Sequence, residues 1–216
     1  MVRSSTASSL LLLFLLSSSL LSIAMGVEHK INDAQGLITF SNAVKSGTNF
    51  TGTTVVLGSD IDFTGGYSER FAPIGNSSRY FNGIFDGQGH TIRNLKVNSS
   101  SKYVGLFGYS LGSAIQNVVI DDSCSFGSSY SSGNSFVGSI LGYCRSANGP
   151  CTIESVVSMG SVLFEGNTTW NVFVGGIAGY IYSANYSNTL KNCVNYGSVT
   201  HSGGNFVEMG GIAGTS

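Results

Sequence analysis

Charged residues, proline and histidine are all scarce in this chain. Only 10% of its 216 residues are charged, and it has 2 prolines and 3 histidines. Because an average protein has about 25% charged residues, the solvated faces that a helical bundle or an ordinary α/β enzyme needs are largely missing. The formal net charge of −1, with no basic stripe, argues against nucleic acid as a partner.

Glycine and aromatic side chains are abundant instead. The chain has 30 glycines, 13 phenylalanines and 10 tyrosines, and 42% of its residues are hydrophobic. Average glycine usage is about 7%, so glycine is roughly doubled here. The hydrophobic content is high enough to form a core, which argues against disorder.

Residues 1–26 have the pattern of a secretory signal peptide. Arg3 precedes an apolar run, and small residues suit cleavage after Ala24 or Gly26. A membrane anchor is the alternative, but spanning needs about 20 apolar residues and residues 17–19 are all serine. We therefore expect a secreted or cell-surface protein whose mature chain has no transmembrane segment.

Export also bears on the cysteines and on glycosylation. Cys144 and Cys151 flank a segment that contains Asn148-Gly149-Pro150, a turn signal, so we predict a disulfide between them, with two free thiols as the alternative. Cys124 and Cys193 have no evident partner. Five Asn-x-Ser/Thr sequons are candidate N-glycosylation sites, although a chain so rich in these residues produces nearly as many by chance. They lie at Asn49, Asn76, Asn98, Asn167 and Asn185.

An internal repeat is the most informative feature of the sequence. The string Val-Gly-Leu-Phe-Gly-Tyr at residues 104–109 recurs in varied form at residues 137–143, 174–180 and 209–214. A second apolar element follows the first three copies, at residues 115–120, 153–158 and 190–195, and residues 92–97 read as an earlier copy. The repeat length is therefore about 35 residues.

These elements predict the fold. Each is short, β-branched or aromatic, and bounded by glycine, asparagine or serine, as strands are. A unit with two or three such strands cannot bury its apolar side alone, whereas stacked units can. We predict an all-β fold in which residues 53–216 form a right-handed parallel β-helix (a solenoid), with a β-propeller as the alternative. Asn94, Asn117 and Asn192 are expected at its corners, hydrogen-bonded to exposed backbone.

Residues 27–52 are predicted to be an N-terminal cap with a short amphipathic helix. Asp33 suits the N-cap of a helix from Ala34 to about Lys45, and Gly47 suits its end. The apolar face of this helix contains Leu37, Phe40 and Val44. At the other end the last repeat has no second element, so we expect the solenoid to be incomplete at its C-terminus.

The sequence resembles the GLUG-motif repeat proteins. The string Phe-Asn-Gly-Ile-Phe-Asp-Gly-Gln-Gly-His-Thr-Ile at residues 81–92 is similar to the opening segment of that family. The later Val-Gly-Gly-Ile-Ala-Gly and Leu-Lys-Asn-Cys-Val-Asn-Tyr-Gly-Ser-Val strings are similar to its repeat. The resemblance covers the chain from about residue 31 onward and implies an exported or surface β-helix protein. Some members are attached to peptidases, but the family supplies no shared catalytic residues.

Catalytic patterns are weak. The G-x-S-x-G string at residues 108–112 matches a hydrolase nucleophile elbow, but it closes a β repeat and only His201 follows it. A β-helix polysaccharide lyase or hydrolase is the enzyme alternative. It would need paired carboxylates or a calcium-binding acidic cluster. Asp60 with Asp62, and Asp121 with Asp122, are the candidates, and we interpret both pairs as turn and loop residues.

Three tyrosines form the one candidate ligand site. Tyr109, Tyr143 and Tyr180 take equivalent positions in successive repeats, so stacking would align them in a ladder. Packing at a corner is one interpretation and a sugar-binding strip is the other, since sugar C–H faces pack well on aromatic rings. The overall expectation is a non-catalytic adhesion or interaction module with carbohydrate or surface-protein partners. No catalytic residue, metal or cofactor is expected.

Overall fold

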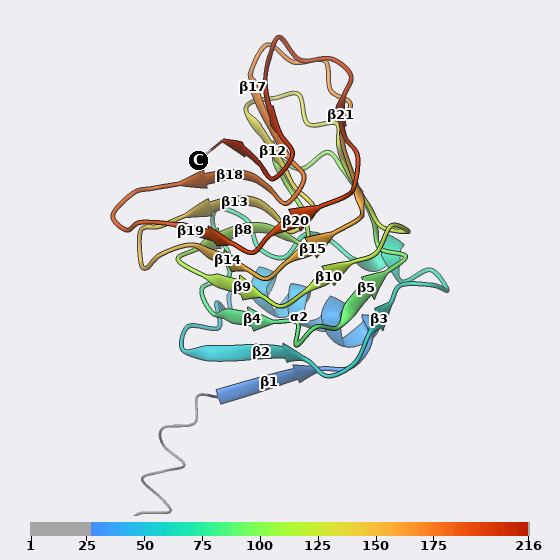
Figure 1. Cartoon of the computed structure of the whole chain (residues 1–216), viewed down its shortest axis with the longest axis vertical. Helices are drawn as coiled ribbons and strands as arrows, with labels where there is room; N and C mark the ends of the chain where they lie inside the picture. The colour runs from blue at the N-terminus through green and yellow to red at the C-terminus, as the bar shows by residue number, and fades with distance from the viewer. Residues whose placement is uncertain (1–26, 216) are drawn as a thin grey trace, which may run out of the picture.

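The computed structural model describes residues 27–215, so the predicted signal peptide at residues 1–26 lies outside the described part of the chain. Figure 1 shows short strands stacked in coils, which run from the N-terminal end at the bottom to the C-terminal end at the top. The strands pair in parallel from coil to coil. The blades of a β-propeller are antiparallel, so the parallel β-helix is confirmed and the propeller is wrong.

The strands form five parallel sheets, which we number in the order that each coil visits them. Sheet 1 contains β1 (Val27–Ile31), β2 (Thr53–Leu57), β4 (Ile84–Asp86), β9 (Ala114–Gln116), β14 (Thr152–Glu154) and β19 (Thr189–Lys191). Sheet 2 contains β3 (Ile61–Asp62), β5 (Thr91–Arg93), β10 (Val119–Ile120), β15 (Val157–Ser158) and β20 (Val194–Asn195). Sheet 3 contains β6 (Lys96–Ser99), β11 (Ser125–Ser128), β16 (Ser161–Phe164) and β21 (Val199–His201). Sheet 4 contains β7 (Tyr103–Val104), β12 (Ser135–Val137), β17 (Asn171–Gly175) and β22 (Phe206–Gly210). Sheet 5 contains β8 (Phe107–Leu111), β13 (Leu141–Arg145), β18 (Ala178–Tyr182) and β23 (Ala213–Thr215).

Each full coil therefore contributes five strands, not the two or three that we predicted. Strands such as β10 and β15 have only two residues, which is too short for a sequence pattern to separate them from their neighbours. The register of the main repeat is as predicted, since Tyr143 pairs with Tyr109 on one side and Tyr180 on the other.

One predicted alignment is wrong. Residues 92–97 were read as an earlier copy of residues 115–120, but Ile92 stacks on Ile120, and Phe85 stacks on Ile115. The error arises because Asn94 and Asn117 each follow a strand and turn the chain in the same way, with positive φ values of 57° and 53°. Their side chains also differ from the prediction, because both amides donate to a carboxylate of a neighbouring coil and not to backbone.

The N-terminal end of the solenoid is covered by helix α2 (Ala34–Ser46). As predicted, Asp33 accepts a hydrogen bond from Gly36 N–H at the start, and Gly47 ends the helix with φ of 111°. Phe40 lies on the buried face and its ring is 5.6 Å from Phe81 and 6.2 Å from Phe85. Strand β1 precedes the helix and pairs with β2, although no strand was predicted there. Among residues 27–215, no helix is long and apolar enough to cross a membrane. A 3₁₀ turn, η1 (Ser68–Arg70), lies between β3 and β4.

The repeated glycines bring sheets 4 and 5 into close contact. A Cβ added at Gly142 in β13 would lie 2.7 Å from Gly108 O, 2.8 Å from Val104 N and 3.0 Å from Phe136 O. All three are backbone atoms, so only glycine fits. The second glycine of the repeated string therefore allows the backbone of sheet 5 to pack directly against that of sheet 4.

The predicted disulfide is present. Cys144 in β13 is bonded to Cys151, with their Cα atoms 6.3 Å apart. Both residues are buried, and the bond closes the connection from sheet 5 of one coil to sheet 1 of the next. Cys124 and Cys193 are free thiols.

Candidate functional site

The predicted tyrosine ladder exists. Tyr109, Tyr143 and Tyr180 project from β8, β13 and β18, with ring centroids 5.1 and 5.5 Å apart and ring planes within 17° and 5° of parallel. The spacing is that of stacked parallel strands, about 4.8 Å, with the rings offset. The middle ring therefore has a parallel ring on each side.

A second aromatic column, which the sequence reasoning missed, lies beside the first. Tyr103, Phe136 and Phe173 come from β7, β12 and β17 of sheet 4, with neighbouring centroids 5.5 and 5.1 Å apart. Each meets its partner in sheet 5 edge to face, at 5.1, 5.0 and 4.9 Å. The signal was available, because each of these residues directly precedes the Val that opens a repeat. We call the six residues of the two columns the tyrosine strip.

The strip is only partly exposed, because Tyr109, Phe136 and Phe173 are buried while Tyr103, Tyr143 and Tyr180 are partly buried. Tyr143 and Tyr180 are partly buried, and Tyr109 is 8% exposed. Within the described residues, no hydrogen bond uses the hydroxyl of any of the three. Burial and the neighbouring tyrosines raise the pKa of Tyr143 far above its ordinary value. Burial also raises the pKa of Tyr109. A protonated phenol can both donate and accept a hydrogen bond.

Cationic groups flank the strip. The Lys102 amine lies 5.4 Å from the Tyr103 ring centroid and 5.6 Å from that of Phe136, within cation–π range. A hollow of about 350 Å³ adjoins this end of the strip. Lys45, Lys102, Tyr103, Tyr130 and Ser77 are among its lining residues, and its charged lining residues are the two lysines. The hollow therefore suits a small anionic group better than a cation.

A larger hollow of about 530 Å³ lies elsewhere, between the segment around η1 and β6. Phe63 and Phe71 supply apolar lining, while Glu69 and Lys96 bring one charge of each sign. We do not favour this hollow as the site despite its size, because its lining includes neither aromatic column and has no net charge. We therefore place the candidate site at the tyrosine strip.

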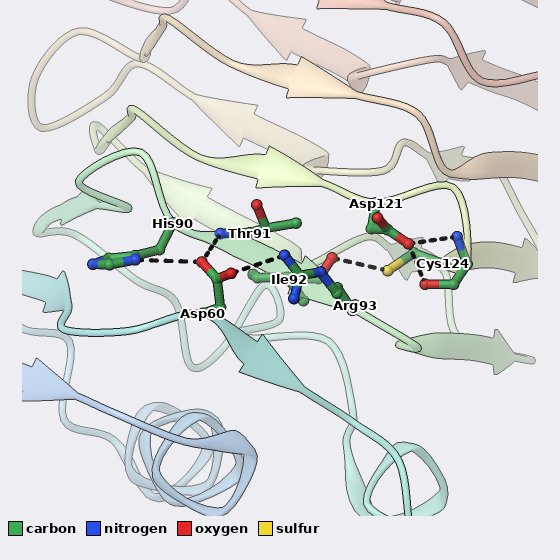
Figure 2. A network of polar contacts seen from close by, with 8 residues as sticks. Asp60, His90, Thr91, Ile92, Arg93, Asp121 and Cys124 are labelled. Carbon is green, nitrogen blue, oxygen red and sulfur yellow. Dashed lines mark hydrogen bonds and ion pairs between the residues drawn. The ribbon is translucent and has the colours of Figure 1, made fainter.

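Three of the four carboxylates proposed for an enzyme, Asp60, Asp62 and Asp121, are engaged in structural contacts. Figure 2 shows those of Asp60 and Asp121. Asp60 accepts hydrogen bonds from Thr91 N–H at 2.9 Å and from Arg93 at 2.8 Å, and His90 Nδ1 lies 3.4 Å away. The Thr91 N–H is the main influence that lowers the pKa of Asp60. Hydrogen bonds from Asn94 and Thr64 likewise lower the pKa of Asp62.

Asp121 follows the same pattern. Its carboxylate accepts from the hydroxyl and the N–H of Ser123, which lowers its pKa. A glycosidase needs one carboxyl group whose pKa is raised so that it can act as the acid. The pKa values of Asp60, Asp62 and Asp121 are all lowered instead. Within residues 27–215, no group of three or more His, Cys, Asp or Glu side chains is placed to hold a metal ion.

The G-x-S-x-G string is part of strand β8 and its following turn. Ser110 is fully buried in the strand, and its hydroxyl has no hydrogen-bond partner. A nucleophile elbow exposes its serine at a strand-to-helix turn, so Ser110 is a core residue.

The other predicted positions are spread over the surface. All five sequon asparagines are exposed, namely Asn49, Asn76, Asn98, Asn167 and Asn185. Asn76 is one of the lining residues of the lysine-lined hollow. Burial raises the pKa of Cys124 to about 11, and its thiol points to Ile92 O (Figure 2), so it is a core thiol rather than a reactive one.

One comparison with known proteins gives a result. The chain is similar in fold to a crystal structure from Bacteroides ovatus, described as a "putative immunoglobulin A1 protease", with a TM-score of 0.58 and 22% sequence identity. The match covers 86% of this chain and 61% of that one, so this chain spans less than two thirds of the similar structure. No family model and no curated protein matches. At this identity the likeness supports the β-solenoid fold alone.

Proposed function

We propose that the protein is an exported β-solenoid that recognises a ligand through the tyrosine strip and carries out no reaction on it. The observation that carries the proposal is the column of Tyr109, Tyr143 and Tyr180, whose ring centroids are 5.1 and 5.5 Å apart and whose hydroxyls have no hydrogen-bond partner among the described residues. Tyrosines with an apolar body and a free polar end are typical of recognition surfaces.

The ligand we favour is an acidic polysaccharide. A row of hydroxyls spaced by one coil can bind successive units of an extended glycan. Lys45 and Lys102 in the adjoining hollow would pair with a carboxylate or sulfate group. Because Tyr143 has a parallel ring on each side, the contacts would be made by hydroxyls and ring edges. Tyr109 and Tyr180 each have one ring side without a stacked tyrosine, and Tyr180 is the less buried of the two. A surface protein is the second partner class.

The cellular setting is also part of the proposal. The signal-peptide pattern, the disulfide and the GLUG-like strings all support export and kinship with the GLUG-motif repeat proteins. N-glycosylation at the five exposed sequons is proposed with it. Mass measurement of the protein from its natural source tests both points, because it gives the mature N-terminus and the attached glycan mass.

Replacement of Tyr143 by phenylalanine tests the proposal. Tyr143→Phe keeps the ring and its stacking but removes one hydroxyl. Phe136 and Phe173 stack in the neighbouring column without a hydroxyl, so the loss of the group should not disturb the stacking. Loss of one hydrogen bond is worth about 0.5–1.5 kcal/mol, so we expect about twofold to thirteenfold weaker binding to acidic polysaccharides in titration calorimetry. Tyr196→Phe, at a tyrosine that is 74% exposed and outside the strip, is the matched control.

Two results would refute the proposal. Equal binding by both variants would make the tyrosine column purely structural. Shortening of the polysaccharide during incubation would show catalysis, and Asp60, Asp62, Asp121 and Asp122 would then be replaced in turn. No binding to neutral or acidic glycans would favour the surface protein.

A further inference from the structure

Strand β6 is an edge strand within the body of the solenoid. Sheets 1 and 2 begin with β1 and β3, which precede η1 in the chain, whereas sheet 3 begins only with β6. The segment that contains η1 follows β3 but, among residues 27–215, adds no strand to sheet 3. The hollow of about 530 Å³ lies between this segment and β6. The hollow is thus found where the next strand of sheet 3 would lie.

The backbone groups of β6 alternate in direction. Its odd-numbered residues face β11, since Ser129 N–H donates to Ser99 O. The N–H and C=O groups of Lys96 and Asn98 therefore point away from β11, toward the hollow. Lys96 N–H donates to Ser68 Oγ at 3.1 Å, but Asn98 N–H has no partner in the part of the chain that the structure describes. One donor and two carbonyl groups of this edge are free to pair.

The side chains at this edge indicate what a partner strand would contain. Val97 is 4% exposed, and Phe63 and Phe71 line the same hollow, so the residue opposite Val97 should be apolar. Lys96 is exposed, and neither it nor Glu69 forms an ion pair among the described residues. A lysine on an edge strand disfavours indiscriminate pairing, whereas a cross-strand pair of opposite charge is favourable. The residue opposite Lys96 should therefore be acidic.

We propose that the edge of β6 binds an extended peptide segment of another protein, which adds to sheet 3 as a parallel strand. Only an extended backbone offers N–H and C=O groups in the alternation that a strand edge requires. In parallel pairing, the residue opposite Val97 donates its N–H to Lys96 O and accepts from Asn98 N–H. The segment has an acidic residue followed by an apolar one, opposite Lys96 and Val97. This site shares no lining residue with the tyrosine strip, so the proposal is independent of the polysaccharide.

A short peptide tests the proposal by NMR titration of the whole folded protein. The protein is produced without N-glycans, because Asn98 is a sequon residue. The probe is Thr-Glu-Val-Thr-Val-Thr, whose first valine would lie opposite Val97. We expect a saturable shift of the Asn98 amide signal and slower exchange of its proton. The control is the same peptide with a methyl group on the nitrogen of that valine, which should bind at least about tenfold more weakly.

Two variants of the protein separate the backbone from the charge. Asn98→Pro removes the free donor but none of the bonds between β6 and β11, and proline is tolerated at such an edge position. It should nearly retain the melting temperature and bind the probe at least about tenfold more weakly. Lys96→Glu should reverse the preference between the probe and a version with lysine in place of glutamate, by about twofold to fivefold in each direction. Lys30→Glu, at an exposed lysine of β1, should leave the preference unchanged.

Several results would overturn the proposal. These are the absence of a saturable shift at Asn98, equal binding of the methylated peptide, and equal binding by Asn98→Pro. Shifts of the Asn98 amide that depend on protein concentration without peptide would also overturn it, because a second copy would then occupy the edge. If Asn98→Pro does not fold, the methylated peptide and Lys96→Glu still decide the question. Neither variant alters the tyrosine strip, so failure here and failure of the polysaccharide proposal are separate results.

Discussion

Replacement of Gly142 by alanine should destabilise the protein strongly, and replacement of Gly127 should not. The two glycines lie in β13 and β11 of the same coil, and neither has a positive φ. An added Cβ at Gly142 would lie within 3.0 Å of three backbone atoms of neighbouring strands, while at Gly127 the nearest atom would be Asn98 Oδ1 at 3.6 Å. The pair therefore separates the effect of close sheet packing from the general effect of removing a glycine.

The expected magnitudes follow from two contributions. Both substitutions restrict the unfolded chain, which stabilises the folded state by about 0.4–1 kcal/mol. Overpacking costs about 1–3 kcal/mol, and more where the neighbours cannot move. The atoms around Gly142 belong to backbone already fixed by the sheets, so we expect a net loss of about 2 kcal/mol for Gly142→Ala. Gly127→Ala should gain up to about 1 kcal/mol.

Urea unfolding followed by circular dichroism measures both changes in the free energy of unfolding. The disulfide must stay oxidised, because Cys144 lies two residues after Gly142. Equal slopes for the parent and both variants are required before midpoints are compared. If Gly142→Ala fell within about 0.5 kcal/mol of Gly127→Ala, the close approach of sheets 4 and 5 would be refuted.

Two further predictions concern covalent and electrostatic links between coils. Reduction of the Cys144–Cys151 bond, which spans a sequence separation of 7, should lower the free energy of unfolding by about 2.5 kcal/mol, measured by urea unfolding with and without reductant. An unchanged midpoint would contradict this. Burial alone would raise the pKa of Asp86, but hydrogen bonds from Gln88 N–H, Gln116 and Asn117 hold it below its ordinary value. Its contribution is therefore present above the unfolded pKa of about 3.9 and is lost as the pH falls through the lower folded value. Asp86→Asn should flatten this acid limb in melting temperatures between pH 6 and pH 2, and a limb of unchanged steepness would assign it to other carboxylates.

The sequence was sufficient for the architecture because the repeat is local and dense in information. Gly108, Gly142 and Gly179 recur at nearly constant spacing, and stacking is the only way for so short a unit to bury its apolar side. The helix could also be predicted from the sequence, since Asp33 suits a helix N-cap and Gly47 suits the left-handed conformation that ends a helix. The Cys144–Cys151 bond followed from one turn signal between two cysteines.

The errors share one physical cause, which is that coil-to-coil pairing is not encoded in any local window. Asn94 and Asn117 have the same left-handed turn conformation after a strand, so the sequence could not tell which strand stacks on which. Strand β1 is held by its pairing with β2, and its own five residues contain three charged or polar side chains that read as a loop.

The tyrosine strip shows how the repeat glycines and the candidate site depend on each other. Tyr143 reaches Phe136 edge to face at 5.0 Å because the backbone of β13 lies against that of β12, and Gly142 makes this approach possible. A larger residue at the glycine would separate the two aromatic columns. The glycines therefore let the repeated tyrosines stack in a column against a second aromatic column, and the spacing of the rings follows from the strand spacing.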